Sequence, residues 1–284
     1  MADVLVYATE SRAQTARAVL GAACGATGIS ARLELYGTGS LYQRLGPRRS
    51  QPLPDVVMWF GPFAARAAAV DGLLQPYRPT SVADGATHDP DWMWTTLDYS
   101  APGVLGAPPV AGFGDLAGVP RLTLADPERS EVGMSLLLAV IDRARQVEGD
   151  PERGWMWWQQ RARSGLALAE DEATAQATIG QRGVSHALGL LETSEPLPGL
   201  APLPHAVGLA ASSRNVEGGR ALLDWMTGPA AASIVRLSPW QAGSNGLQAL
   251  LAAAPPLDVE WARQQYTAAR RRWADSAFGP ALES

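Results

Sequence analysis

Residues 122–133 read LTLADPERSEVG, a sequence that joins an apolar strand to the start of a helix. We expect the strand at 122–125 and an apolar-periodic helix that runs from 134 to 147. The turn between them leaves unpaired backbone N–H groups at the helix start, next to the hydroxyl of Ser130. The stretch therefore predicts an α/β fold with a place where a ligand can bind.

A second apolar run, residues 184–191, predicts another strand, which breaks into the polar residues Glu192 and Thr193. In an open α/β sheet, ligands bind beyond the carboxyl ends of the strands. We therefore expect Ser130 and Glu192 to face the same crevice.

The beginning of the chain predicts a parallel pair of strands. Residues 4–7 and 31–36 have strand patterns, and residues 14–24 between them carry apolar side chains at helical spacing. Strand, helix and strand at this spacing form a βαβ unit, in which the two strands run parallel. Ser11 lies in the segment that caps the helix.

The loop after the second of these strands reads GTGS at 37–40. Gly39 permits close approach of the backbone, and Thr38 and Ser40 add hydroxyl donors, which suits a phosphate, a phosphonate or a carboxylate. An ordinary helix N-cap has the same residue types. The loop is therefore either a ligand loop or a cap.

Aromatic and imidazole side chains supply further candidates. Trp59 ends a third strand at 55–59, where an indole either fills the core or stacks on a ligand. Trp92 and Trp94 alternate within 91–99, which predicts a strand with both indoles on one side. His205 begins a late strand and is either a structural residue or a ligand contact.

Composition bounds the function. The chain has 284 residues, enough for two domains, and its net charge of −5 carries no basic stripe, so nucleic acid is not an expected partner. All 23 cationic residues are arginine, which excludes lysine Schiff-base chemistry. Cys24 stands alone, so no intrachain disulfide can form. No GxSxG, HExxH, Walker or GxGxxG motif occurs, and we expect neither an enzyme nor a bound cofactor or metal ion.

Residues 113–127, FGDLAGVPRLTLADP, resemble the crossover of the periplasmic solute-binding proteins of ABC importers, in the branch that takes up ferric iron, 2-aminoethylphosphonate or thiamine. Residues 4–11 are similar to the opening strand of that family, and residues 217–226 to its late helix. The resemblance implies an α/β, two-lobed type II fold, in which each lobe is a mixed sheet flanked by helices and hinges join the lobes.

The same resemblance implies the order of the lobes. Residues 1–98 would begin lobe 1, residues 99–204 would form lobe 2, and residues 205–284 would return to lobe 1 with C-terminal helices packing across the lobes. The implied partners are a small-molecule ligand and an importer permease, and we expect a monomer. The implied location is periplasmic or extracytoplasmic, with the export signal removed ahead of residue 1.

The ferric members of the family use a histidine, a glutamate and a tyrosine pair, and this sequence has Ser11, Phe60 and Glu192-Thr193 at the matching places. Hydroxyls and helix starts favour a small anionic or zwitterionic ligand that resembles an organophosphonate, and Glu131 and Glu192 would bind an amino group of that ligand. Glu131 alternatively serves only the helix dipole. The expected ligand-binding residues are Ser11, Thr38, Gly39, Ser40, Trp59, Ser130, Glu131, Gly133, Glu192, Thr193 and His205. The alternatives are a ferric or thiamine-type receptor, or a sensor or enzyme on this fold.

Overall fold

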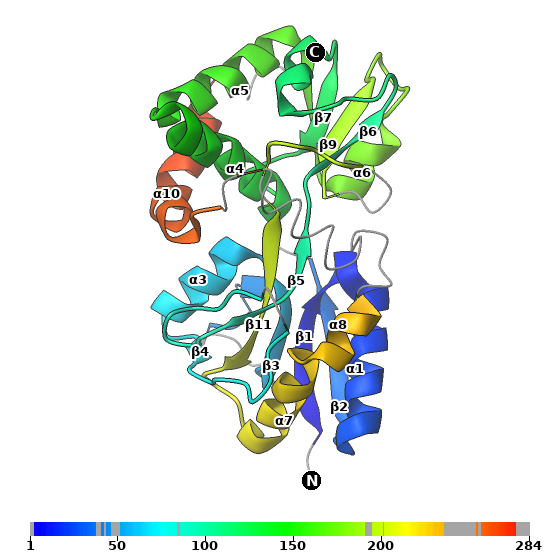
Figure 1. Ribbon diagram of the computed structural model, residues 1–284, viewed down its shortest axis with the longest axis vertical. Coiled ribbons are helices and arrows are strands. Elements are labelled where there is room, and N and C mark those ends of the chain that lie inside the picture. Colours follow the sequence, from blue (N-terminus) through cyan, green and yellow to red (C-terminus); the bar gives the residue numbers. More distant parts are fainter. Residues whose placement is uncertain are drawn as a thin grey trace. The chain divides into compact units, whose positions relative to one another are not determined.

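The computed structural model describes residues 3–37, 41–42, 44–46, 52–83, 86–190, 195–200, 202–235, 254 and 257–276. The chain forms two compact units, each with its own sheet (Figure 1). Unit 1 contains Met1–Tyr99 and Pro204–Gln241, and unit 2 contains Ser100–Leu203 and Ala242–Ser284. Among the described residues, no helix combines the length and the apolar character that crossing a membrane requires.

Unit 1 is built on a mixed sheet with the order β2-β1-β3-β11-β4, and β5 also pairs with β11. The β1 strand is parallel to β2 and β3, as the βαβ pattern predicts, whereas β11 runs antiparallel to β3. The strands are β1 (Val4–Thr9), β2 (Ala31–Tyr36), β3 (Val56–Phe60), β4 (Leu74–Gln75), β5 (Thr95–Ser100) and β11 (Leu203–Ala210).

Helices cover both faces of this sheet. The face that carries Val4, Val6 and Ala8 packs against α1, α7 and α8, and the face that carries Leu5 and Tyr7 packs against α3 (Figure 1). This alternation follows from the period of two along β1, whose six residues are all buried. The helices are η1 (Glu10–Arg12), α1 (Ala13–Thr27), α3 (Pro62–Val70), α7 (Val216–Met226) and α8 (Pro229–Val235).

Unit 2 has a second mixed sheet with the order β10-β6-β9-β7-β8. The β7 strand is parallel to β8 and β9, and β6 is antiparallel to β9 and β10. The strands are β6 (Gly103–Gly106), β7 (Leu122–Ala125), β8 (Leu166–Ala169), β9 (His186–Gly189) and β10 (Glu195–Pro196). The expected strand at 122–125 is thus confirmed.

The helices of unit 2 are η2 (Phe113–Gly118), α4 (Glu131–Glu148), α5 (Pro151–Gly165), α6 (Glu172–Ala177) and α10 (Val259–Asp275). The α4 and α5 helices form a hairpin because Gly149 ends α4 with φ of 75° and Asp150 caps α5. Gly154 makes the hairpin close, since a Cβ there would lie 2.6 Å from Ile141 Cα.

The last helix, α10, belongs to unit 2. Its N-cap, Asp258, donates its N–H to Asp142 of α4 at 2.9 Å and accepts from Arg145 at 2.9 Å. These bonds, together with packing of Trp273 against Trp158 of α5, attach α10 to the α4–α5 hairpin.

The strand predicted at 91–99 is wrong at its beginning, because β5 starts at Thr95. A turn occupies the earlier residues: Asp89 accepts hydrogen bonds from the N–H groups of Asp91 and Trp92. Trp92 has φ of 59°, a left-handed conformation that no regular strand contains. The two indoles therefore do not alternate along one strand.

Candidate functional site

The carboxyl ends of β1 and β3 define one edge of the unit 1 sheet. Ala8 pairs with Met58, and Phe60 pairs with Ala206 of the antiparallel β11 strand. His205 therefore lies one residue beyond the end of β3. The segment that follows β1 begins at the same edge, which is where ligands bind in open α/β sheets.

Three charged or titratable side chains are buried at this edge. Arg12 is 8% exposed, Asp98 is 5% exposed and His205 is 9% exposed. The pKa of His205 is lowered to about 4, mainly because the ring is buried; the negative charge of Asp98 opposes this shift, and the positive charge of Arg12 adds to it. At neutral pH His205 is therefore uncharged, while Arg12 carries a charge.

Trp59 does not present its indole as a stacking platform. Its φ of 53° breaks the alternation along β3, so that Trp59 packs on the same face as Val56 and Met58, in the core under α1 and α7. Its side chain is 1% exposed, and its Nε1 is buried without a hydrogen-bond partner among the described residues. The core interpretation of Trp59, not the ligand interpretation, fits this conformation.

The corresponding edge of unit 2 is built from the residues after β7 and β8. Ser130 caps α4, and its Oγ accepts the N–H of Gly133 at 3.2 Å. The same Oγ donates its proton to Oε1 of Glu172, at the start of α6, at 2.8 Å. Burial raises the pKa of Glu172, and the hydrogen bond from Ser130 opposes this shift. The single hydroxyl proton of Ser130 is thus already donated.

Two neighbours of Ser130 have different roles. Gly133 is required by packing, because a Cβ there would collide with the carbonyl oxygen of Ala125 and lie 2.9 Å from its carbon. Glu131 is 7% exposed, at the positive end of the α4 dipole. Burial raises the pKa of the Tyr266 phenol, and the negative charge of Glu131 adds to that shift. Glu131 and Tyr266 of α10 therefore lie close enough to interact.

Apart from Trp59, which lies in the core of unit 1, the predicted site residues divide into four groups. His205 lies with Arg12 and Asp98 in unit 1, and Ser130, Glu131 and Gly133 lie together in unit 2. Ser11 is in the η1 turn after β1, and only its backbone is described. The candidates outside the described residues are Thr38, Gly39, Ser40, Glu192 and Thr193.

Sequence reasoning selected none of the charged residues that the structure places at these two edges, Arg12, Asp98 and Glu172. Arg12 could have been found from its position just beyond the first strand, where ligand contacts occur in this class of sheet. Asp98 carried a weaker signal, a carboxylate in an otherwise apolar strand. The hydrogen bond between Ser130 and Glu172 gave no signal in the sequence, since it joins residues 42 positions apart.

The opposite edge of the unit 1 sheet is structural. A hollow of about 280 Å³ opens there, lined by Asp3, Arg32, Pro52, Asp55 and Arg214, among others. Asp55 accepts from the N–H of Leu5 at 2.8 Å and from Ser213 at 2.8 Å, which ties β1 to the turn after β11. Within the described part of the chain, no group of three or more histidine, cysteine or acidic residues could hold a metal ion.

No protein-family profile matches the chain, and no curated protein matches it in sequence. Several solved structures are similar to it in fold. Iron-bound HitA from Pseudomonas aeruginosa has a TM-score of 0.75 and 16% identity, with 96% of this chain and 99% of that chain covered. The periplasmic binding protein AfuA from Actinobacillus pleuropneumoniae, with fructose-6-phosphate bound, has a TM-score of 0.75 and 13% identity, with 96% and 98% covered.

A periplasmic thiamin binding protein has a TM-score of 0.68 and 19% identity over 95% of both chains. At such identities the likeness establishes architecture, and it extends over nearly the full length of each chain. The chain has the two-lobed type II fold of the periplasmic binding proteins.

Proposed function

We propose that the chain is an extracytoplasmic solute receptor of an ABC importer, which binds a small zwitterionic solute with an amino group and does not convert it. The observation that carries the ligand class is a pair of opposite charges at one edge of unit 1. Arg12 and Asp98 are both buried there, and both interact with His205. In unit 2, the carboxylates of Glu131 and Glu172 lie at the starts of α4 and α6.

This set of charges matches a solute with groups of both signs. A guanidinium binds a phosphonate or carboxylate through paired hydrogen bonds, and a carboxylate binds an ammonium group. A simple anion such as phosphate fits poorly, because the Ser130 proton goes to Glu172 and two carboxylates flank the start of α4. An organophosphonate with an amino group meets both requirements.

The solved structures with this fold support the receptor assignment, since those proteins are binding proteins. A thiamine-type receptor is the second candidate, because an excess of carboxylates also favours a cationic solute. The burial of Trp59 removes the stacking surface that a ring would use in this conformation.

Melting scans with four solutes test the proposal. A solute that binds only the folded chain raises the free energy of unfolding by RT ln(1 + [L]/Kd), about 2.7 kcal/mol at 100 times Kd. We expect 2-aminoethylphosphonate to raise the midpoint and inorganic phosphate to leave it unchanged. A rise with phosphate or Fe(III)-citrate, and none with 2-aminoethylphosphonate or thiamine, would show that the ligand class is wrong.

A further inference from the structure

Four aspartates are buried among the described residues, and three of them have both carboxylate oxygens bonded. Asp55 accepts from Leu5 N through Oδ2 and from Ser213, Arg214 N and Asn215 N through Oδ1. Asp142 accepts from Arg145 at 2.9 Å through Oδ1 and from Gln146 at 2.7 Å and Asp258 N at 2.9 Å through Oδ2.

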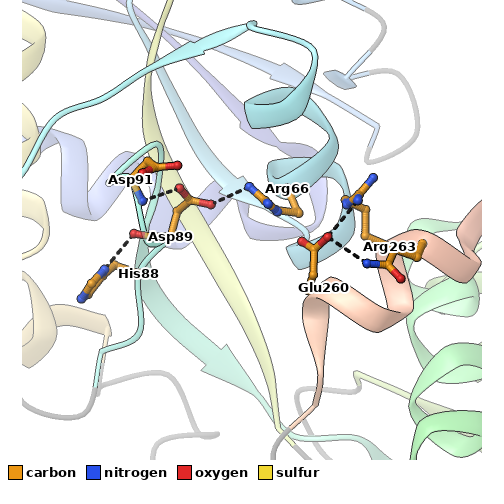
Figure 2. A network of polar contacts seen from close by, with 7 residues as sticks. Arg66, His88, Asp89, Asp91, Glu260 and Arg263 are labelled. Atoms are coloured by element: carbon orange, nitrogen blue, oxygen red, sulfur yellow. Dashed lines mark hydrogen bonds and ion pairs between the residues drawn. The ribbon is translucent and has the colours of Figure 1, made fainter.

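Asp89 is the third, and it is fully buried. Its Oδ2 accepts from Arg66 at 3.1 Å and its Oδ1 accepts from the N–H of Asp91 at 3.0 Å, as Figure 2 shows. These three buried carboxylates are thus paired, as the desolvation cost of a charge requires.

Asp98 is the exception. It is 5% exposed, and its Oδ1 is buried without a hydrogen-bond partner in the described part of the chain. It lies on β5, and the chain passes from unit 1 to unit 2 directly after Tyr99. The charged or titratable groups that interact with His205 on the neighbouring β11 strand are Asp98 and Arg12.

An unsatisfied acceptor on a buried carboxylate lowers stability, so its presence calls for a compensating use. The other carboxylates of the strand edges are less suited to a new partner: Glu172 already accepts from Ser130, and Glu131 interacts with Tyr266. Access to Asp98 requires motion, which receptors of this fold supply by hinge bending.

We propose that Asp98 Oδ1 is the acceptor that binds the amino group of the solute. The proposal rests on the receptor function proposed above and names the carboxylate, among three candidates, that recognises the cationic group. In the solute-free protein, the unsatisfied Oδ1 of Asp98 lowers the stability of the fold. This loss is offset when the solute donates a hydrogen bond to Oδ1.

The test compares Asp98→Asn with Asp55→Asn, a buried aspartate at the opposite edge of the same sheet. Titration calorimetry uses 2-aminoethylphosphonate and ethylphosphonate, which lacks the amino group. The wild type should prefer 2-aminoethylphosphonate, and Asp98→Asn should bind it roughly 10- to 100-fold more weakly, the range for one hydrogen bond to a charged group. Ethylphosphonate affinity should stay within about twofold, and Asp55→Asn, measured well below its melting midpoint, should change neither affinity.

Melting of the solute-free variants supplies a second readout. Removal of an unsatisfied buried charge should leave the Asp98→Asn midpoint equal to or above that of the wild type, whereas Asp55→Asn should melt lower. A lower midpoint for Asp98→Asn with unchanged preference for 2-aminoethylphosphonate would overturn the inference, because Asp98 would then be structural.

The two proposals fail differently. If the wild type binds neither phosphonate, the proposed ligand class is wrong, and the melting comparison then tests the assignment of Asp98. A melting midpoint of Asp98→Asn below that of the wild type overturns the assignment, and a midpoint at or above that of the wild type supports it. If the wild type prefers 2-aminoethylphosphonate and Asp98→Asn keeps the full preference, the receptor proposal stands and the assignment of Asp98 is wrong.

Discussion

The hydroxyl of Ser130 donates its proton to the carboxylate of Glu172 over 2.8 Å, which links the start of α4 to the start of α6. Ser130 also caps α4 through the N–H of Gly133. Ser130, which the sequence suggests as a donor to an oxyanion, therefore has a structural role: its oxygen caps α4, and its proton is donated to a carboxylate.

Ser130→Ala should lower the free energy of unfolding by about 1 kcal/mol, the usual cost of losing an N-cap, with some further loss from the unpaired Glu172. Chemical denaturation at neutral pH measures this change. Ser30→Ala, at an exposed loop position, is the control and should change stability by less than about 0.5 kcal/mol. An unchanged stability for Ser130→Ala, together with loss of phosphonate binding, would assign Ser130 to the solute instead.

Gly133→Ala should destabilise unit 2 by about 1–3 kcal/mol, because the added Cβ collides with the backbone of Ala125. Gly21→Ala is the matched change in α1, where a Cβ meets no atom within 4 Å. Alanine there should stabilise the helix by up to about 1 kcal/mol. Thermal melts of the two variants should therefore shift in opposite directions, and a shared direction would contradict the close approach of α4 to β7.

The folded-state pKa of His205, about 4, lies below its ordinary value of 6.5. Between these values the unfolded chain binds a proton that the folded chain does not, so the free energy of unfolding falls as pH is lowered from 6.5 toward 4. The loss should reach about 3 kcal/mol at pH 4. Denaturation curves of His205→Gln should lack this part of the slope, and an identical slope in both proteins would show that His205 is not buried in its neutral form.

Burial raises the pKa of Asp55, but hydrogen bonds from Leu5, Asn215, Ser213 and Arg214 outweigh it, and the pKa lies below the model-compound value of 3.8. Its ionised form therefore contributes stability above pH 3.8, and this contribution is lost as pH falls through the lowered pKa. Asp55→Asn should cost about 1–3 kcal/mol at pH 7, since it leaves buried N–H groups without an acceptor. The difference in the free energy of unfolding between this variant and the wild type should shrink below pH 3.8. A difference that does not depend on pH would show that the charge of Asp55 does not contribute to stability.

Much of the fold could be predicted because the spacing of apolar residues along the chain shows which face of a strand or helix is buried. The strand at 31–36 and the helix of α4 follow from apolar spacing, and the structure extends that helix to Glu131–Glu148. The turn at Asp89 was missed because a left-handed Trp92 has no sequence signature. The attachment of α10 to α4 has no sequence signature either, since it depends on bonds from Asp258 to residues over a hundred positions away.

The candidate site was predicted only as far as strand ends could be located. Ser130, Glu131 and His205 were chosen because they stand near such ends, and their roles in ligand binding stay predictions. For Trp59 the sequence left a core role and a ligand role open, because it does not show which face a strand-end residue joins; the φ of 53° and the packing of the indole favour the core role. Asp98 was not found, because an unsatisfied oxygen is a property of the packed structure and not of residue order.

Titration calorimetry of the purified chain with 2-aminoethylphosphonate, followed by recovery of the solute, tests the central claim most directly. The receptor account predicts saturable binding of one solute per chain, return of the solute chemically unchanged, and no competition from inorganic phosphate. Displacement by phosphate, or recovery of a cleaved or deaminated product, would contradict it.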